Sequence, residues 1–419
     1  MILKNLSERL MKKILVHGGT PLFGEVDISG SKNAALPIIF ATLICDGVSY
    51  LTNVPDIGDV DSAIDIIKSF GAVVERRGSS LTVDTRHVFY TVPSSEQMSK
   101  LRASSYIIGA SLSRFGIAPV PSVGGCNFCY RPIDMHVYAA ECLGASRDGG
   151  VLVCDNLRGG AVRFSRPSVG ATANALLMSA SANGVTKIYG YAREPHINAL
   201  IDFLLSAGAD IEISDECITV TGTRLHGGCV RIIGDMIEAG TYLAAGVITG
   251  GEVLVRGVGR TEMNAFIEFL MRLGCQVRYD GDAIVAGVGN PADFVAVTAD
   301  PYPAYPTDLA PIAAPLIARY SRGCITDNVW RDRFGYLHTL SRFGVRYSTL
   351  GGRALIFPSE ICSASVDAPD LRGGAACILC ALCASGQSDI GSAQIIFRGY
   401  ENIEKKLRAM GARIEINDF

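Results

Sequence analysis

The chain has 419 residues, of which nearly half are apolar and 19% are charged, a composition that can bury large cores and differs from that of a disordered chain. Its net charge of −3 gives no indication of a nucleic-acid-binding surface, and no apolar run reaches the ~20 residues that span a bilayer. The length predicts two or three domains. Met1 to Lys13 carries no signal-peptide pattern, so the 13 Cys indicate free thiols in the cytoplasm.

One unit recurs six times: an amphipathic helix that ends in an apolar residue, Gly and a small residue, followed by a strand, a polar turn and a second strand. In chain order the copies are Ile64–Asp84, His136–Cys154, Leu200–Thr221, Phe266–Ala286, Leu337–Phe357 and Ile403–Ile416. Their glycines are Gly71, Gly144, Gly208, Gly274, Gly344 and Gly411, spaced by 73, 64, 66, 70 and 67 residues. Each glycine lies where a helix end favours a left-handed residue.

A second helix type alternates with these copies. Its members are Ser31–Asp46, Ser104–Arg114, Ser168–Ala182, Ala239–Thr249, Thr307–Arg319 and Arg372–Ala384. They are apolar on all sides and too short for a membrane, which predicts helices buried inside the protein. We therefore expect an α/β protein of two domains, each with three βαβαββ-like repeats around buried central helices.

The N-termini of the buried helices are expected to gather at one end of each domain, where their unpaired N–H groups favour an anion. These positions hold Lys32, Asn33, Arg102, Ser168, Val169, Gly170, Asp308 and Arg372. Ordinary capping accounts in part for Ser168 and Asp308. A cation opposes the helix dipole at Lys32 and Arg372, which indicates an anionic ligand.

Cys126 follows two glycines in a loop that also holds Pro119, Pro121 and Arg131. A neighbouring cation lowers the pKa of a thiol and makes it a nucleophile or proton donor, although most free Cys are inert. Cys126 and Cys129 form a CxxC pair, but a thioredoxin-like context and a second pair for zinc are both missing.

Three further cysteines, Cys377, Cys380 and Cys383, have iron–sulfur-like spacing but fall inside an apolar helix, which favours a core role. The six His form no metal-spaced cluster, and no phosphate-binding glycine motif is complete, so we expect no metal and no cofactor. Arginines recur instead at repeat junctions, where they suit bidentate binding of phosphate and carboxylate. They are Arg102, Arg131, Arg333, Arg372 and Arg398.

Eight motifs carry a family resemblance. They are Ser31-Lys32-Asn33-Ala34-Ala35-Leu36-Pro37, Gly124-Gly125-Cys126, Arg131-Pro132-Ile133-Asp134, Ala192-Arg193-Glu194-Pro195, Pro306-Thr307-Asp308, Asp332-Arg333-Phe334, Asp370-Leu371-Arg372 and Arg398-Gly399-Tyr400-Glu401. Together, from about Gly18 to the C-terminus, the chain resembles the bacterial UDP-N-acetylglucosamine enolpyruvyl transferases (1-carboxyvinyltransferases). The resemblance implies an inside-out α/β barrel of two domains. One spans 31–233 and the other 1–30 plus 234–419, with crossings near Lys32 and Asp235.

The resemblance also implies the substrates, phosphoenolpyruvate and a uridine nucleotide, and residue roles. Cys126 would be the general acid on a lid and the target of fosfomycin, and Asp308 the base. The implied phosphate ligands of phosphoenolpyruvate are Lys32, Arg131 and Arg398, and its carboxylate ligands are Arg333 and Arg372, with Arg102 nearby and Asp370 in support. The implied nucleotide ligands are Arg131, Pro132, Ile133 and Asp134 for uracil and Ser168, Val169 and Gly170 for phosphate. Asn33, Arg166 and Val329 complete the expected substrate-binding set.

Departures from the family pattern concern the acceptor side. The family usually has Trp at Tyr106, Lys at Arg166, Glu at His196 and Arg at Met236. It also has a Gln-rich run at Ala310-Pro311-Ile312, Glu-Asn at Arg331-Asp332 and His-Ile-Asp at Ile395-Ile396-Phe397. Two acceptors therefore stay open: UDP-N-acetylglucosamine of peptidoglycan synthesis, and the 3′-hydroxyl of UMP in nucleoside-antibiotic pathways. A transferase of the shikimate 3-phosphate type and an inactive nucleotide-binding paralogue are the alternatives. The sequence predicts no oligomeric state.

Overall fold

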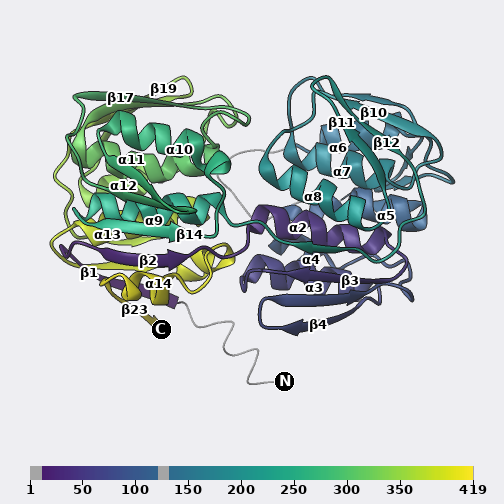
Figure 1. The fold of residues 1–419 in the computed structure, drawn as a ribbon, viewed down its shortest axis with the longest axis horizontal. Coiled ribbons are helices and arrows are strands. Elements are labelled where there is room, and N and C mark those ends of the chain that lie inside the picture. Colours follow the sequence, from purple (N-terminus) through teal and green to yellow (C-terminus); the bar gives the residue numbers. More distant parts are fainter. Residues whose placement is uncertain (1–11, 121–131, 419) are drawn as a thin grey trace. The chain divides into compact units, whose positions relative to one another are not determined.

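The computed structural model describes residues 12–120 and 132–418, which divide into two compact units (Figure 1). Unit 1 comprises residues 12–29 and 234–418, and unit 2 comprises residues 30–120 and 132–233. Each unit contains three small sheets and its own hydrophobic core among the described residues. The α/β class and the repeat-based architecture predicted from the sequence are confirmed.

Unit 2 contains the first three copies of the repeat. Its elements are α2 (Lys32–Ala41), η1 (Thr42–Ile44), β3 (Val48–Thr52), α3 (Gly58–Ser69), β4 (Val73–Arg77), β5 (Ser80–Asp84), α4 (Ser95–Lys100), η2 (Arg102–Tyr106), α5 (Ile107–Phe115), β6 (Ile117–Pro119), α6 (Asp134–Cys142), β7 (Ser146–Asp148), β8 (Val151–Val153), β9 (Ala161–Arg163), α7 (Val169–Ser179), β10 (Val185–Tyr189), α8 (Pro195–Ser206), β11 (Asp210–Ile213), β12 (Cys217–Thr221) and β13 (Cys229–Arg231).

Unit 1 contains the other three copies and the N-terminal strands. Its elements are β1 (Lys12–Gly18), β2 (Phe23–Asp27), α9 (Met236–Ile248), β14 (Glu252–Arg256), α10 (Arg260–Leu273), β15 (Gln276–Asp280), β16 (Ala283–Gly287), β17 (Phe294–Ala299), η3 (Thr307–Leu309), α11 (Ala310–Tyr320), β18 (Arg322–Asp327), α12 (Gly335–Leu340), η4 (Ser341–Phe343), β19 (Arg346–Leu350), β20 (Arg353–Phe357), β21 (Ser365–Asp367), α13 (Leu371–Cys383), β22 (Gly386–Gly391), η5 (Ala393–Arg398), α14 (Ile403–Ala409) and β23 (Arg413–Asp418).

Five of the six sheets among the described residues have four strands, in which one parallel pair is followed by antiparallel pairs; their orders are β13-β3-β5-β4, β11-β12-β10-β9, β15-β16-β14-β2, β17-β18-β20-β19 and β21-β22-β1-β23. The sixth, β6-β8-β7, is a three-stranded antiparallel sheet. In the last copy the second strand is β1, because Ile14 pairs with Ile416 of β23. The two ends of the described chain therefore meet in one sheet.

The helices predicted to be apolar on all sides are buried. In α9 every residue from Ile237 to Ile248 is buried, and in α13 every residue from Arg372 to Leu382. Cys377 and Cys380 lie in this core, where burial raises the pKa of both thiols, as expected of structural cysteines. No helix in the described part of the chain combines the length and apolar character needed to cross a membrane.

The six repeat glycines all adopt the left-handed conformation predicted for them. Their φ values lie between 87° for Gly71 and 98° for Gly411. At Gly274 an added Cβ would also lie 1.9 Å from the carbonyl oxygen of Asn290, whereas at Gly411 it would meet no atom within 4 Å. Gly411 is therefore required only for its left-handed conformation, whereas at Gly274 a side chain would also clash with the backbone.

Replacing these two glycines by alanine should destabilise the protein to different degrees. Gly411→Ala should lower the free energy of unfolding by about 1 kcal/mol, the cost of a left-handed alanine. Gly274→Ala should cost more than about 2 kcal/mol, because the new methyl group also displaces backbone. Chemical unfolding measures both, with Gly287→Ala as a control, since its φ is not left-handed and its Cβ would approach the Glu252 side chain and the Gly251 carbonyl oxygen no closer than 3.4 Å. Equal losses of unfolding free energy in the two variants would show that the clash at Gly274 does not contribute.

Candidate active site

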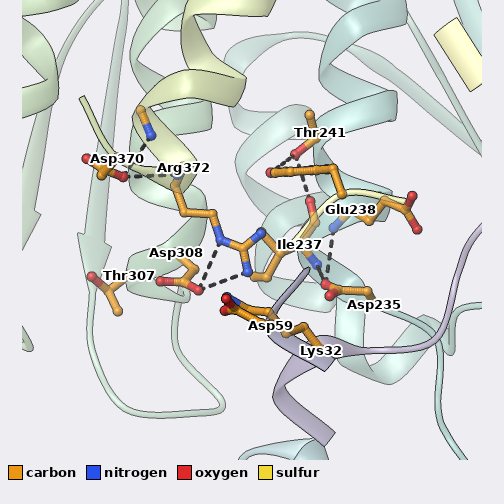
Figure 2. A network of polar contacts seen from close by, with 12 residues as sticks. Lys32, Asp59, Asp235, Ile237, Glu238, Thr241, Thr307, Asp308, Asp370 and Arg372 are labelled. Carbon is orange, nitrogen blue, oxygen red and sulfur yellow. Dashed lines mark hydrogen bonds and ion pairs between the residues drawn. The ribbon is translucent and has the colours of Figure 1, made fainter. Parts of the chain in front are cut away.

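The N-terminal ends of α11 and α13 are joined by one carboxylate in unit 1 (Figure 2). Asp308 lies in η3, directly before α11, and Arg372 is the second residue of α13. The Arg372 Nε atom donates to Asp308 Oδ2 at 3.2 Å, and Arg372 Nη2 lies 3.2 Å from the same oxygen. The prediction that helix N-termini gather chemically active side chains thus holds for these two helices.

A second guanidinium group binds the other oxygen of the same carboxylate. Arg333 Nη1 donates to Asp308 Oδ1 at 2.7 Å and to Thr307 Oγ1 at 3.1 Å. The side chains of Arg333 and Arg372 are only 3% and 2% exposed, whereas that of Asp308 is 29% exposed. Two buried cations therefore share one partly exposed anion.

Burial acts to lower the pKa of both arginines, but the neighbouring carboxylates, Asp308 first among them, raise the pKa of each above its usual value. Both guanidinium groups are therefore charged. Nη1 of Arg372 forms no hydrogen bond with any described residue, although the atom is buried. A buried guanidinium N–H without an acceptor favours binding of an anion.

Aspartates cap α13, which carries Arg372, and α9. Asp370 Oδ1 accepts hydrogen bonds from the backbone N–H groups of Arg372 and Gly373 at 2.9 and 3.0 Å. Asp235 does the same for α9, accepting from the N–H groups of Ile237 and Glu238 at 2.8 and 3.2 Å. Asp370 thus supports Arg372 by fixing the first turn of its helix.

Behind Arg333 lies a second carboxylate that sequence reasoning missed. Thr307 Oγ1 donates to Asp327 Oδ2 at 2.6 Å, while Asp327 Oδ1 accepts from the N–H groups of Val329 and Trp330 at 3.0 and 2.7 Å. Burial raises the pKa of Asp327. Through these contacts Asp327 orders Val329, a predicted ligand, and the turn leading to Arg333. Arg398, the last residue of η5, is half-buried.

In unit 2 the predicted phosphate ligand Lys32 opens α2, and its Nζ lies 3.1 Å from Asp59 Oδ2 of α3. Asp59 is buried, so this contact places a negative charge beside the N-terminus of α2. Because Asp59 offsets the Lys32 charge, and Asp308 offsets that of Arg372, the opposition between cation and helix dipole does not by itself require a ligand. Asn33 is half-buried in the first turn of α2.

The predicted nucleotide segment opens α7 in the expected way. The Ser168 hydroxyl accepts from the N–H of Ala171 at 3.4 Å. Gly170 cannot carry a side chain, because an added Cβ would lie 2.5 Å from Nε2 of the buried His136. Asn174 of α7 bonds to α5 through its Oδ1, which accepts from the N–H of Gly109 at 2.6 Å.

The other predicted ligands of unit 2 vary in exposure. Pro132 and Ile133 are half-buried, and Asp134, which opens α6, is exposed, as is Arg166. Cys126 and Arg131 lie outside the described residues, and the side chain of Arg102 is likewise outside them. Their roles stay predictions. Within the described part of the chain, no group of three or more His, Cys, Asp or Glu is arranged to hold a metal ion.

A buried ion pair anchors the chain beside α9. Glu238 Oε1 lies 2.8 Å from Lys406 Nζ, and Glu238 Oε2 accepts from the N–H of Ser29 at 2.7 Å. Lys406 Nζ also donates to Ser29 Oγ at 2.7 Å, and the Ser29 carbonyl accepts from the N–H of Asp235. Burial raises the pKa of Glu238 to about 7, although Lys406 opposes that shift. This pair links residues 168 positions apart, a contact that sequence patterns do not reveal.

Comparisons with known proteins find similarity to carboxyvinyltransferases. The family model for EPSP synthase (3-phosphoshikimate 1-carboxyvinyltransferase) matches residues 16–407. A UDP-N-acetylglucosamine 1-carboxyvinyltransferase of Caldanaerobacter subterraneus subsp. tengcongensis is 39% identical over 412 residues, covering 96% of this chain and 99% of the relative. One from Halothermothrix orenii is 38% identical over 411 residues, with coverage of 96% and 99%.

Solved structures share the fold. The enolpyruvyl transferase NikO from Streptomyces tendae superposes with a TM-score of 0.87 at 24% identity, covering 98% of this chain and 100% of the other. An EPSP synthase from Acinetobacter baumannii gives a TM-score of 0.71 at 17% identity, covering 97% and 100%.

The raised pKa of Glu238 predicts a pH dependence of stability. Because its folded-state pKa of about 7 exceeds the usual glutamate value of 4.5, its protonated form stabilises the fold fully below pH ~4.5, and this contribution is lost as pH rises to about 7. The loss should be on the order of 3 kcal/mol. Chemical unfolding between pH 4.5 and 8 should show Glu238→Gln with a correspondingly flatter profile than wild type. The exposed Glu268→Gln is the matched control and should keep the wild-type slope; an unchanged slope in Glu238→Gln would contradict the prediction.

Proposed function

The chain belongs to the carboxyvinyl (enolpyruvyl) transferase family of enzymes, and from this premise we propose that it transfers the enolpyruvyl group of phosphoenolpyruvate to a hydroxyl of a uridine nucleotide, releasing phosphate. The observation that carries the proposal is the pair of buried guanidinium groups, Arg333 and Arg372, on the single carboxylate of Asp308. Phosphoenolpyruvate supplies a carboxylate and a phosphate, both of which suit arginine.

The substrate carboxylate would bind the two arginines and take over part of their interaction with Asp308. A carboxylate held between two guanidinium groups is a weak base, because both cations favour its charged form. When the substrate anion shares those cations, Asp308 becomes a stronger base for the acceptor hydroxyl. Binding of the donor would in this way activate the group that the next step needs.

The reaction proceeds by addition and elimination. A general acid, in this proposal Cys126, protonates the methylene carbon of phosphoenolpyruvate, leaving positive charge at C2. The acceptor oxygen attacks C2 as Asp308 takes its proton, giving a tetrahedral ketal. Loss of a methyl proton and cleavage of the C2–O bond to phosphate then form the enol ether. Lys32, Arg131 and Arg398 would stabilise the departing phosphate.

The acceptor is the finer part of the proposal. The similarity to UDP-N-acetylglucosamine 1-carboxyvinyltransferases favours UDP-N-acetylglucosamine as the acceptor. The departures at Tyr106, Arg166, His196 and Met236 favour a different acceptor that keeps the uracil, with UMP as the candidate. In this proposal Pro132, Ile133 and Asp134 contact uracil, and Ser168, Val169 and Gly170 contact a nucleotide phosphate at the start of α7.

Phosphate release from phosphoenolpyruvate tests the proposal, with UMP, UDP-N-acetylglucosamine and shikimate 3-phosphate supplied separately. We expect release with at least one uridine nucleotide and none with shikimate 3-phosphate. Release with UMP alone would identify the specialised acceptor. Release with shikimate 3-phosphate alone would overturn the proposal. Absence of release with all three acceptors would also overturn it and would favour a paralogue that only binds nucleotide.

Asp308→Asn should lower kcat by about 10² or more, because a general base contributes 10²–10⁴ and the amide cannot accept the proton. The same change leaves Arg333 and Arg372 without their carboxylate, so thermal unfolding must be measured beside the rate. Asp282→Asn, in an exposed turn, is the matched control and should keep both activity and stability. A folded Asp308→Asn enzyme with a wild-type kcat would remove Asp308 from the mechanism.

A further inference from the structure

The orientation of Arg372 is the least explained feature of the candidate site. The guanidinium group is buried, and Asp308 Oδ2 contacts it only along its Nε and Nη2 side. Contacts to a single oxygen leave the plane of the group free to turn about that oxygen. The other edge, which carries Nη1, forms no hydrogen bond of acceptable geometry with the described residues. Some other group must hold the plane if this edge is to meet a ligand.

Tyr400 is the side chain placed to do so. It is 1% exposed and follows η5, and its ring centroid lies 5.4 Å from Cζ of Arg372. Its hydroxyl oxygen lies 2.9 Å from Thr241 Oγ1 of α9. Burial raises the pKa of Tyr400, and the neighbouring Arg372 only partly opposes this, so the phenol is neutral.

A count of protons fixes the direction of these hydrogen bonds. Thr241 Oγ1 lies 2.8 Å from the carbonyl oxygen of Ile237, which can only accept, so the single hydroxyl proton of Thr241 is donated there (Figure 2). In the 2.9 Å contact between the two hydroxyls, Tyr400 must therefore be the donor. Its own proton is thus committed to Thr241, and its oxygen can act only as an acceptor.

This acceptor is available to Arg372. The Tyr400 hydroxyl is close enough to contribute to the raised pKa of the guanidinium group, after the larger effects of burial, which lowers the pKa, and of Asp308, which raises it. Donation from a buried Nη atom of Arg372, which forms no hydrogen bond of good geometry with the described residues, would complete a directed chain through Tyr400 and Thr241 to the backbone of α9. It spans helices α9 and α13, whose first turns are capped by Asp235 and Asp370.

We propose that Tyr400, held by Thr241, is a positioning residue that fixes the guanidinium plane of Arg372 for the carboxylate of phosphoenolpyruvate. The proposal rests on the proposed function for the identity of that anion. Tyr400 touches neither substrate nor reacting atoms in it and acts only through Arg372. The competing explanation is that Tyr400 serves as an apolar core residue, in which case phenylalanine would replace it without effect on the substrate.

Tyr400→Phe keeps the ring and removes only the hydroxyl. We expect the KM for phosphoenolpyruvate to rise about tenfold or more at saturating acceptor, with kcat within about twofold, because a hydrogen bond to a charged group is lost in ground and transition states alike. Thr241→Val should raise the same KM less, and Thr241→Ser, which keeps the hydroxyl, should restore it. Tyr320→Phe is the matched control, since it loses a tyrosine hydrogen bond to the carbonyl of Val247 at the far end of α11 and should leave KM unchanged.

Crystal structures of wild type and Tyr400→Phe provide a readout that does not need turnover. We expect the Arg372 guanidinium to turn or to become disordered in the variant while Asp308 stays in place. An unchanged guanidinium overturns the proposal, even if KM rises, since Tyr400 would then act by another route; an unchanged KM in an active enzyme overturns it as well. If none of the three acceptors supports phosphate release by the wild-type enzyme, the proposed function fails, and the crystallographic comparison still decides the role of Tyr400.

Discussion

Two buried guanidinium groups that share one carboxylate are the constraint on which the chemistry of unit 1 depends. Removing such ions from water costs several kcal/mol each, so the protein must surround them with groups of fixed geometry. Asp308 contacts both, and Asp327 supports Arg333 from behind through Thr307. The cluster of Arg333, Arg372 and Asp308 still carries a net positive charge. A site of this kind binds an anion and stabilises negative charge that develops on it.

The helix N-termini contribute to this site differently from the simple expectation. A bare N-terminus offers unpaired N–H groups to an anion. Here Asp370 and Asp235 already accept the first N–H groups of α13 and α9, so those donors are not available to a ligand. The anion must instead be met by side chains, Arg372 above all. The helices serve chiefly to fix the backbone positions from which those side chains extend.

Much of this architecture could be predicted from the sequence because it depends on local patterns. The six repeat glycines, the helices apolar on all sides and the core role of Cys377 follow from periodicity and from the conformational needs of a helix end. Helix boundaries were less accurate: α9 begins at Met236 rather than Ala239, because Asp235 caps it. Long-range polar contacts could not be predicted, since no local pattern encodes that Lys32 meets Asp59 or that Lys406 meets Glu238.

In the proposed mechanism the groups that hold the donor carboxylate belong to a single unit. The groups assigned to the carboxylate of phosphoenolpyruvate, Arg333 and Arg372 with Asp308, all lie in unit 1 and are tied together by hydrogen bonds. A substitution there disturbs several partners at once, because each cation and each cap depends on its neighbours. The departures from the family pattern fall in both units: Tyr106, Arg166 and His196 in unit 2, and Met236, Ala310-Pro311-Ile312, Arg331-Asp332 and Ile395-Ile396-Phe397 in unit 1. An exposed residue such as Arg166 can change without leaving a buried charge unpaired. Acceptor preference can therefore diverge at such positions while the hydrogen-bonded charges of Arg333, Arg372 and Asp308 are retained.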